Sequence, residues 1–389
     1  GATRSAFGDV LFENSTKIER SIISLKHNWK YSKKAKVEQS LRLSNYSRDY
    51  TVIEISNDLS QKDVTKEKDI EYEIMYTKSY PVFNLVYGME FSKPEYTSDR
   101  IKGGNQSFHQ NGAFVQADID LRHNIDLVTG LRVDRFQDTI VVSPRIAVSY
   151  KIKNSWKLRC AYGFGFRSPS FMESLIDWEH VQFGYSLIGN RNLKPEVSRG
   201  ITIGAEYTNN NNFQISYLLY QNRFKNLIED YSIEPGLLSY RNINIAKFSG
   251  IEITTKWAIT SKSSISTSYN YLRDVDGEDD IIPNTIPHSF GSRFSTFLLK
   301  NKVMISLNSK INGKFFPQEF DPNSGDYILS KNAVNPAITS DLFIHYKINR
   351  VNKILFGLNN LSNHTNKSYG PFIGRVFFIE FQKIIDNNK

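Results

Sequence analysis

The chain has 389 residues, a formal net charge of +9 and a negative mean hydropathy, and 13% of its residues are aromatic. No run of eighteen apolar residues occurs, which argues against a transmembrane helix. The Lys and Arg residues are scattered along the chain, which argues against nucleic acid as a partner. The single cysteine, Cys160, excludes an internal disulfide framework and a cysteine-based zinc site.

Alternation of apolar and polar residues with a period of two is the dominant pattern along the chain. Trp156, Leu158 and Cys160 would share one face of a strand, for example. Lys157 and Arg159 would share the opposite face. The pattern predicts about seventeen strands, near 18–30, 36–46, 68–78, 82–92, 110–121, 125–136, 141–152, 154–167, 196–208, 212–225, 240–257, 263–273, 286–299, 303–313, 338–348, 353–359 and 373–382.

Short polar turns alternate with longer connections between these predicted strands. Outer-membrane barrels show this alternation because their periplasmic turns are tight and their extracellular loops are long. We therefore predict an all-β fold, a transmembrane antiparallel β-barrel wall without a helical domain. A β-sandwich, whose buried core would give some of the same alternation, is the alternative. The longer connections are expected near 47–67, 93–108, 136–141, 168–195, 226–239, 274–285, 314–336 and 360–371.

The number and direction of the strands predict which side of the barrel the chain starts from. The last strand is expected to run toward the periplasm. With about seventeen strands, an odd number, and alternating directions, the first strand would run toward the periplasm as well. The chain would then begin on the extracellular side, with Gly1–Ser15 as the remnant of an extracellular loop. Bacterial single-chain barrels have an even number of strands, so further strands are expected upstream. Gly1 is not followed by a charged and then an apolar region, which indicates a processed start.

No arrangement of residues points to catalysis. The seven histidines are far apart and show no metal-ligand spacing, and there is no P-loop or nucleophile motif. Gly163 and Gly165 form a bare Gly-x-Gly in a strand, where glycine relieves crowding on the lumen face rather than binding a dinucleotide. We expect neither an enzyme, nor a cofactor, nor a bound metal.

Four sequence phrases occur in a recognisable order in the second half of the chain. The first is formed by GFRSPSFMES and GNRNLKPEVS, within 161–198, which frame a polar and aromatic insert. The others are at 243–252 (INIAKFSGIE), 357–369 (GLNNLSNHTNKSY) and 374–381 (GRVFFIEF). In this order and spacing they resemble the TonB-dependent outer-membrane receptors. One departure is that QKIIDNNK follows Phe381, where the family usually ends.

The resemblance implies a barrel of 22 strands and an N-terminal plug that contacts the TonB energy-transducing complex. Residues 1–389 would be the C-terminal portion of that barrel, since nothing in them resembles the plug. A second chain or an N-terminal fragment would complete the wall. Arg167 and Arg375 match family motif positions and would project into the lumen toward plug carboxylates, or would simply line it.

Ligand binding is expected in the extracellular loops. Aromatic side chains there would stack on a flat or aryl ligand, and an arginine would pair with an anionic one. The alternative is that these side chains only pack the loops together. The resemblance also makes His180 and His109 candidate haem ligands. The candidate ligand residues are Trp178, His180, Phe183, Tyr185, Arg191, Tyr231, Phe316 and Glu319.

The resulting hypothesis is an active transporter of a scarce, large nutrient in the outer membrane of a Gram-negative bacterium. Its partners would be outer-membrane lipid, the TonB complex and a small-molecule metal chelate such as a ferric siderophore, haem or cobalamin. The alternative function is a plugless or secretion-associated structural barrel without import activity.

Overall fold

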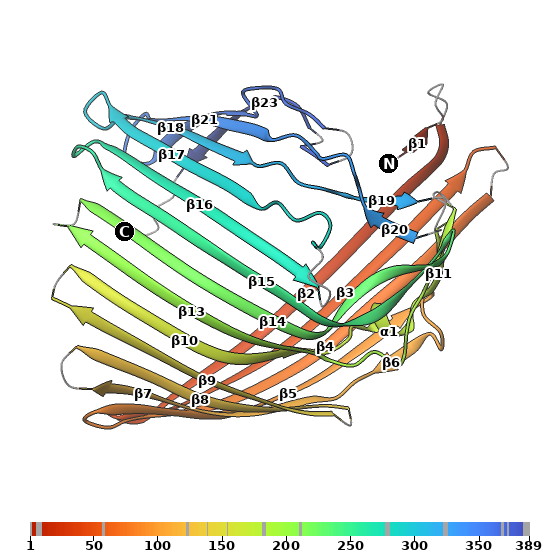
Figure 1. The fold of residues 1–389 in the computed structure, drawn as a ribbon, viewed down its shortest axis with the longest axis horizontal. Helices are drawn as coiled ribbons and strands as arrows, with labels where there is room; N and C mark the ends of the chain where they lie inside the picture. The colour runs from red at the N-terminus through yellow and green to blue at the C-terminus, as the bar shows by residue number, and fades with distance from the viewer. Residues whose placement is uncertain are drawn as a thin grey trace.

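The computed structural model describes residues 2–4, 10–56, 59–121, 124–137, 139–153, 155–180, 184–209, 212–276, 281–321, 326–366, 369–371 and 373–383. Most of these residues form one long sheet, antiparallel throughout the wall, that curves into a barrel wall (Figure 1). No helix in the described ranges is long and apolar enough to cross a membrane.

Seventeen strands in the described part of the chain form the wall, each antiparallel to the next, which confirms the predicted fold class and strand number. Tight turns such as 33–34 and 259–262 join strand pairs at one end of the barrel. The strands are β2 (Val10–Ser32), β3 (Ala35–Glu54), β4 (Leu59–Ser79), β5 (Phe83–Ser98), β7 (Gln110–Leu121), β8 (Ile125–Phe136), β9 (Thr139–Ile152), β10 (Trp156–Arg167), β13 (Glu196–Asn209), β14 (Phe213–Glu234), β15 (Leu237–Ala258), β16 (Ser263–Asp276), β17 (His288–Leu298), β18 (Val303–Asn312), β21 (Ala337–Lys347), β22 (Asn352–Asn359) and β23 (Val376–Lys383).

Three of the predicted long connections, 47–67, 136–141 and 226–239, are wrong, the second because only positions 137–138 separate β8 from β9. The chain there is mostly strand, because β3 and β4 meet at 55–58 and β14 and β15 meet at 235–236. Strand β2 likewise begins at Val10, so Val10–Ser15 is strand rather than loop. These segments rise beyond the apolar band of the barrel, where both strand faces can be polar. The alternation that marks a membrane strand therefore disappears although the hydrogen-bonded ladder continues.

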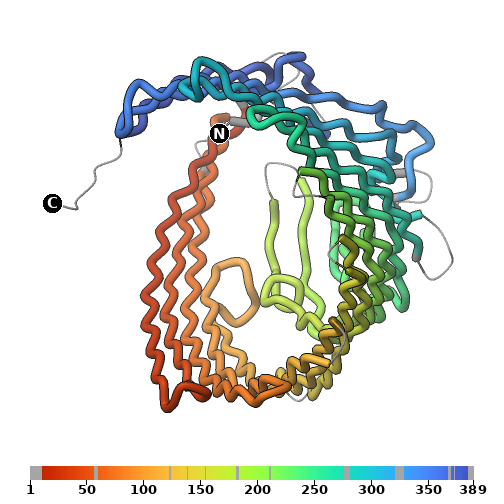
Figure 2. The backbone as a smooth tube through the Cα atoms, turned by 90° about the vertical axis from the view of Figure 1, so that its left-hand side faces the viewer, coloured from red at the N-terminus to blue at the C-terminus, as the bar shows by residue number. Residues whose placement is uncertain are grey.

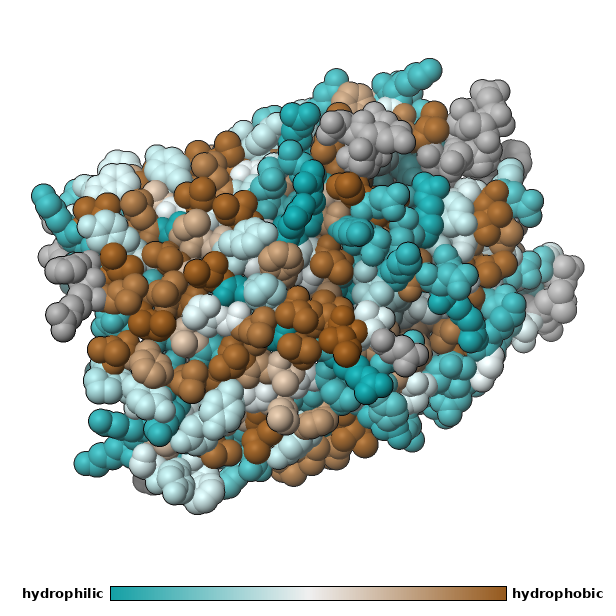
Figure 3. Space-filling model, turned by 60° about the horizontal axis from the view of Figure 1, so that its bottom comes forward, coloured by the Kyte–Doolittle hydropathy of each residue, from teal (hydrophilic) through white to brown (hydrophobic). Residues whose placement is uncertain are grey.

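The outer face carries the apolar side chains of the alternation. In β10, Trp156 and Leu158 are exposed outward, whereas Arg159 reaches an inward carboxylate. Hydrophobic residues gather on the half of the outer face next to the tight turns (Figure 3). Trp29 and Trp257 lie in the same zone, close to the turns at 33–34 and 259–262, as expected of an interfacial aromatic girdle.

The wall is open along one line. In the described part of the chain, β23 pairs only with β22, and β2 pairs with β3 and with the short β1 (Ala2–Arg4). No ladder joins β2 to β23 there (Figure 2). Both strands therefore present backbone hydrogen-bonding groups along an edge.

Two of the connections at the long-loop end fold into the barrel (Figure 2). One is the segment between β5 and β7, which contains β6 (Asn105–Ser107). The other follows β10 and contains the one-turn helix α1 (Phe171–Leu175) and the hairpin β11 (Asp177–His180)–β12 (Tyr185–Ile188). A capping box between Ser170 and Glu173 explains why the helix begins there.

Candidate ligand site in the barrel lumen

A small hydrophobic core joins the two inward loops. The ring of Phe171 stacks on Tyr96 and Phe108, with centroids 5.0 and 4.3 Å apart. The Tyr96 hydroxyl also lies 3.0 Å from the sulfur of Met172. A barrel wall has its polar face inward, so the loops supply their own apolar contacts. The buried members of this core are Tyr96, Ile101 and Leu175.

A buried ion pair fixes the first inward loop to the wall. Arg100, which follows β5, donates two hydrogen bonds to the carboxylate of Asp63 on β4, one of them with Nη2–Oδ2 at 2.9 Å. Their side chains are only 8% and 4% exposed. Arg48 on β3 approaches the same carboxylate at 3.5 Å. Removing one member of such a pair leaves the other charge buried and unpaired, which is costly.

The hairpin β11–β12 brings three of the predicted ligand residues together. The ring of His180 lies between Trp178 and Tyr185, at centroid distances of 4.6 and 5.1 Å. The guanidinium carbon of Arg100 lies 3.8 Å from the ring centroid of Trp178 and 4.9 Å from that of Tyr50. Burial, followed by repulsion from Arg100, lowers the pKa of His180. The result is an aromatic cluster of Trp178, His180 and Tyr185 with a cation against its Trp178 ring.

Arg167 lies at the last position of β10 and is held by two carboxylates. It donates to Glu173 of α1 and to Glu196 at the start of β13, with distances between 2.6 and 3.0 Å. Glu196 also accepts the backbone N–H of Ile228 at 2.8 Å. This arginine therefore joins α1, β10, β13 and β14 at the rim, and its predicted role toward a plug stays a prediction.

The segment GNRNLKPEVS (189–198), the second half of the first sequence phrase, connects the hairpin β11–β12 to β13, which begins at Glu196. Asn190 donates through its side-chain amide to the carbonyl of Tyr240, and Asn242 bonds both backbone groups of Lys194. Arg191 is exposed in the turn that these bonds hold. The asparagines therefore fix the segment to β15 and leave Arg191 accessible.

The remaining predicted ligand residues lie further along the rim. Tyr231 is on β14 rather than in a loop, and the guanidinium carbon of Arg241 lies 4.8 Å from its ring centroid. Phe316 faces the ammonium group of Lys314, and Glu319 accepts a hydrogen bond from Ser330 at 2.6 Å. Glu319 belongs to the small hairpin β19 (Gln318–Asp321)–β20 (Asp326–Leu329), which contacts β14.

Three other sequence predictions concern single residues. Phe183 lies outside the described residues. Arg375 donates to the carbonyl of Leu361 and its N–H to Asn363, so it anchors the connection before β23. His109 is exposed immediately before β7. Among the described residues, no group of three or more His, Cys, Asp or Glu side chains is placed to hold a metal ion.

A lumen cavity of about 760 Å³ lies beneath the inward loops. Its wall combines aromatic rings with charges of both signs, which suits a ligand that has a flat part and ionised groups. It is lined by Arg20, Ile22, Arg42, Ser44, Asn45, Tyr46, Glu67, Lys68, Asp69, Pro94, Glu95, Tyr96, Phe108, Gln110, Phe136, Arg167, Ser168, Pro169, Ser170, Phe171 and Met172.

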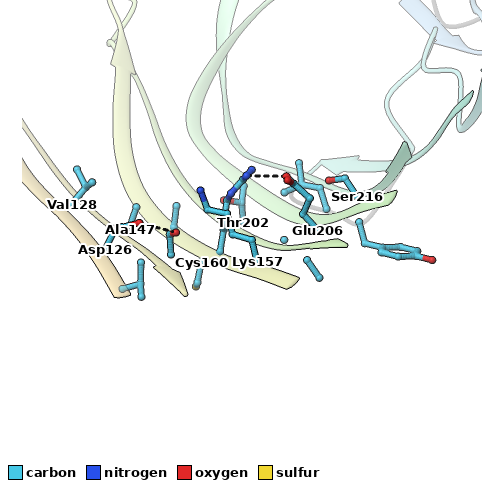
Figure 4. Close-up of a pocket in the computed structure, with 16 residues that line it drawn as sticks. Asp126, Val128, Ala147, Lys157, Cys160, Thr202, Glu206 and Ser216 are labelled. Carbon is cyan, nitrogen blue, oxygen red and sulfur yellow. Dashed lines mark hydrogen bonds and ion pairs between the residues drawn. The ribbon is translucent and has the colours of Figure 1, made fainter. Parts of the chain in front are cut away.

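A smaller cavity of about 240 Å³ lies along β8, β9, β10, β13 and β14 (Figure 4). Arg159 and Glu206 form an ion pair of 2.9 Å on its wall. Ser149 donates to Asp126 at 3.4 Å. Arg159 and Glu206 therefore already compensate each other's charge within this part of the wall.

Sequence reasoning missed the residues that hold the inward loops. Arg100, Asp63, Tyr96 and Phe108 were not singled out, although 93–108 was expected to be a long connection. Their positions in sequence carry no motif, because Asp63 meets Arg100 only when β4 and β5 pair. The signal in the sequence that could have predicted this inward packing is the pair of aromatic residues, Tyr96 and Phe108, within the connection 93–108.

The wall, the apolar outer band and the loop-lined lumen together define a transmembrane β-barrel of the receptor type. Residues 3–361 match the family model described as "TonB dependent receptor-like, beta-barrel". The chain belongs to this family, which confirms the resemblance found in the four sequence phrases.

Two curated relatives give the context of the match. The chain is 25% identical over 258 residues to the iron-regulated outer membrane virulence protein of Vibrio cholerae, covering 62% of this chain and 39% of that protein. It is 22% identical over 288 residues to the heme/hemopexin utilization protein C of Haemophilus influenzae. This match covers 63% of this chain and 40% of that protein. The matched region thus spans about two fifths of the length of these relatives.

Solved structures show the same fold. The ferric enterobactin receptor of Pseudomonas aeruginosa superimposes with a TM-score of 0.79 at 15% identity, covering 97% of this chain and 62% of that one. The siderophore receptor PirA of Acinetobacter baumannii gives a TM-score of 0.77 at 13% identity, and the superposition covers 97% of this chain and 63% of that one.

Proposed function

We propose that this chain forms the barrel wall and the ligand loops of an outer-membrane active transporter for a large metal chelate. The observation that carries the proposal is the lumen cavity, where aromatic rings and arginines meet beneath loops held by buried contacts. The chelate would be a ferric siderophore, haem or cobalamin. The family membership and the names of the relatives support this choice.

Binding in this scheme requires no covalent chemistry. The rings of Trp178, His180 and Tyr185, which belong to the hairpin and do not line the cavity, offer further surfaces for a flat ligand, and the guanidinium of Arg100 lies against the Trp178 ring. Arg191, Tyr231, Phe316 and Glu319 would add contacts from neighbouring loops. Energy would come from the TonB complex acting on a plug.

A further protein segment would complete the wall. In the described part of the chain, β23 and most of β2 have no strand partner on one side, which supports this proposal because strand edges within a bilayer need hydrogen-bonding partners. The segment would belong to the same polypeptide or to a second one, and would also carry the plug.

Binding can be tested on the protein purified from outer membranes in detergent, together with every polypeptide that remains associated. Iron, haem and cobalt would be measured in the purified complex, and peptide mapping would identify all chains. Ferric catecholate, hemin and cobalamin would then be titrated while tryptophan fluorescence is recorded. Quenching by one of them supports the proposal.

A matched pair of variants locates the binding. Trp178→Phe changes the lumen cluster, whereas Trp257→Phe changes the outer face of the wall. We expect the first to weaken binding and to remove most of the quenching, and the second to do neither. A complex that binds none of the three chelates would instead favour the structural barrel without import.

A further inference from the structure

A group of cations lies on the outer face of the wall, on the neighbouring strands β13, β14, β15 and β16 (Figure 1). This face is opposite to the one that looks into the lumen, so a plug in the lumen would leave it free. All but one of the side chains are exposed, and Lys247 is half-buried. The cations are Arg199, Arg223, Lys225, Lys247 and Arg273.

Strand alternation fixes the direction in which these cations point. Arg199 is two residues from Ile201 on β13, and Lys247 is four residues from Ile251 on β15. Both isoleucines are exposed on the apolar outer face, and residues an even number of positions apart share a strand face. Arg223 is the ladder partner of both Arg199 and Lys247, and ladder partners also share a face. The cations therefore point outward.

The cations lie at the upper edge of the apolar band. Arg223 and Lys247 are ten positions along their strands from Phe213 and Trp257, which pair with each other beside the tight turns. Ten residues of an antiparallel strand extend about 34 Å, and a strand tilted by about 40° rises about 26 Å over that length. The apolar band of an outer-membrane barrel is about 25 Å tall. The cations are therefore at the level of the lipid headgroups, on the side away from the tight turns.

The strand register places the like charges directly opposite one another. Arg199 pairs with Arg223, which pairs with Lys247, and neighbouring strands are about 4.8 Å apart. Lys225 is two residues from Arg223 on the same strand. Arg273 is diagonal to Lys247, at a separation of about 7–8 Å. Like charges opposite each other destabilise a sheet, so an anion that contacts several of these cations would remove an unfavourable repulsion.

The described residues supply no carboxylate that forms an ion pair with any of these cations. Other cations of the outer wall are compensated. Arg241, further along β15, lies 2.9 Å from the carboxylate of Glu229. On β5, Lys93 lies 3.2 Å from Glu95, at the same distance from the tight turns as Arg223 on β14. The missing counter-charge is thus a property of this group of cations and not of the whole outer face.

We propose that the outer face of β13, β14, β15 and β16 binds an anionic membrane lipid whose headgroup carries two or more phosphate groups. The acyl chains would lie on the apolar residues next to the cations, such as Ile201 and Ile251. The phosphate groups would contact the cations, because arginine and lysine form strong charge-assisted hydrogen bonds with phosphate. The proposal rests on the outer-membrane location of the barrel and not on the chelate that it imports.

Native mass spectrometry of the protein with its associated polypeptides, in a neutral detergent, tests the proposal by counting bound lipids. The probes are diphosphoryl and monophosphoryl lipid A, which differ by one phosphate group. The test variant is Arg223→Gln with Lys247→Gln, which should fold because it relieves repulsion between facing like charges. The control is Lys62→Gln with Lys93→Gln, which removes two outer cations that are already paired with carboxylates. A heat-dependent shift in gel mobility verifies that each barrel is folded.

We expect diphosphoryl lipid A to bind wild type and control alike, and to bind the test variant about tenfold more weakly. Monophosphoryl lipid A should bind wild type more weakly than the diphosphoryl form. Arg223→Lys with Lys247→Arg keeps both charges and should bind as wild type does. No binding to wild type, equal weakening in test variant and control, or unchanged binding in the test variant would overturn the proposal. Equal binding of the two lipids would also overturn it.

Discussion

The guanidinium carbon of Arg100 lies 3.8 Å from the ring centroid of Trp178, although 77 positions separate the two residues in sequence. Arg100 belongs to the connection after β5, and Trp178 belongs to the hairpin β11–β12. The same guanidinium is paired with Asp63 on the wall. One arginine therefore fixes two inward loops and the barrel wall relative to one another.

Replacing Asp63 by asparagine should release the first inward loop. The change leaves the Arg100 guanidinium buried without its charge partner, which costs about 3–5 kcal/mol in comparable pairs. We expect faster hydrogen exchange at 99–104, measured by mass spectrometry on the detergent-solubilised barrel. Glu71→Gln is the control, since its partner Arg42 is half exposed and the pair contributes little. Equal exchange in both variants would contradict the proposed anchoring role.

The hairpin around His180 should loosen in mild acid. Its pKa is lowered below the ordinary value of 6.5, first by burial and then by Arg100, so the unfolded hairpin binds a proton more readily than the folded one. Its stabilisation is therefore fully present above that value and weakens as the pH falls below it. Fluorescence of Trp178, with the other tryptophans replaced by phenylalanine, reports the change. His180→Gln should flatten this profile, and an unaltered profile would exclude His180 as its cause.

Docking of α1 should have a second pH dependence, at lower pH. Burial alone would raise the pKa of Glu173, but hydrogen bonds from Arg167 and Ser170 outweigh it and hold the pKa below the ordinary value of 4.5. The stabilisation is present above 4.5 and is lost as the pH falls through the lower folded value. Hydrogen exchange at 171–176, corrected for its intrinsic pH dependence, measures it. Glu173→Gln should remove the step, and its persistence would assign it to another group.

A methyl group at Gly357 should impair folding of the C-terminal strands. A Cβ there would lie 2.2 Å from the ring of Phe378 on β23, and overpacking of this kind costs about 1–3 kcal/mol. We expect less heat-modifiable, folded barrel for Gly357→Ala, and recovery when Phe378→Leu is added. Gly163→Ala is the control, because its nearest neighbour would be 3.4 Å away. Failure of Phe378→Leu to restore folding would show that ring contact is not the cause.

The predicted strands were recovered because each lipid-facing position must be apolar and each lumen-facing position need not be. Trp156 and Leu158 alternate with Lys157 and Arg159 for that reason, and the pattern is local in sequence. The prediction failed where strands leave the apolar band. Tyr231 was expected in a loop but lies on β14, since an exposed ladder needs no hydrophobic alternation.

The sequence by itself determined the barrel, its strand order and the family, since these follow from local alternation and from short ordered phrases. Only the tertiary structure decided that two loops turn inward, that Arg100 meets Asp63 and Trp178, and that Arg199, Arg223 and Lys247 lie side by side. These contacts join residues that are distant along the chain. Strand pairing and the curvature of the wall bring them together, and neither can be read from the spacing of residues in the sequence.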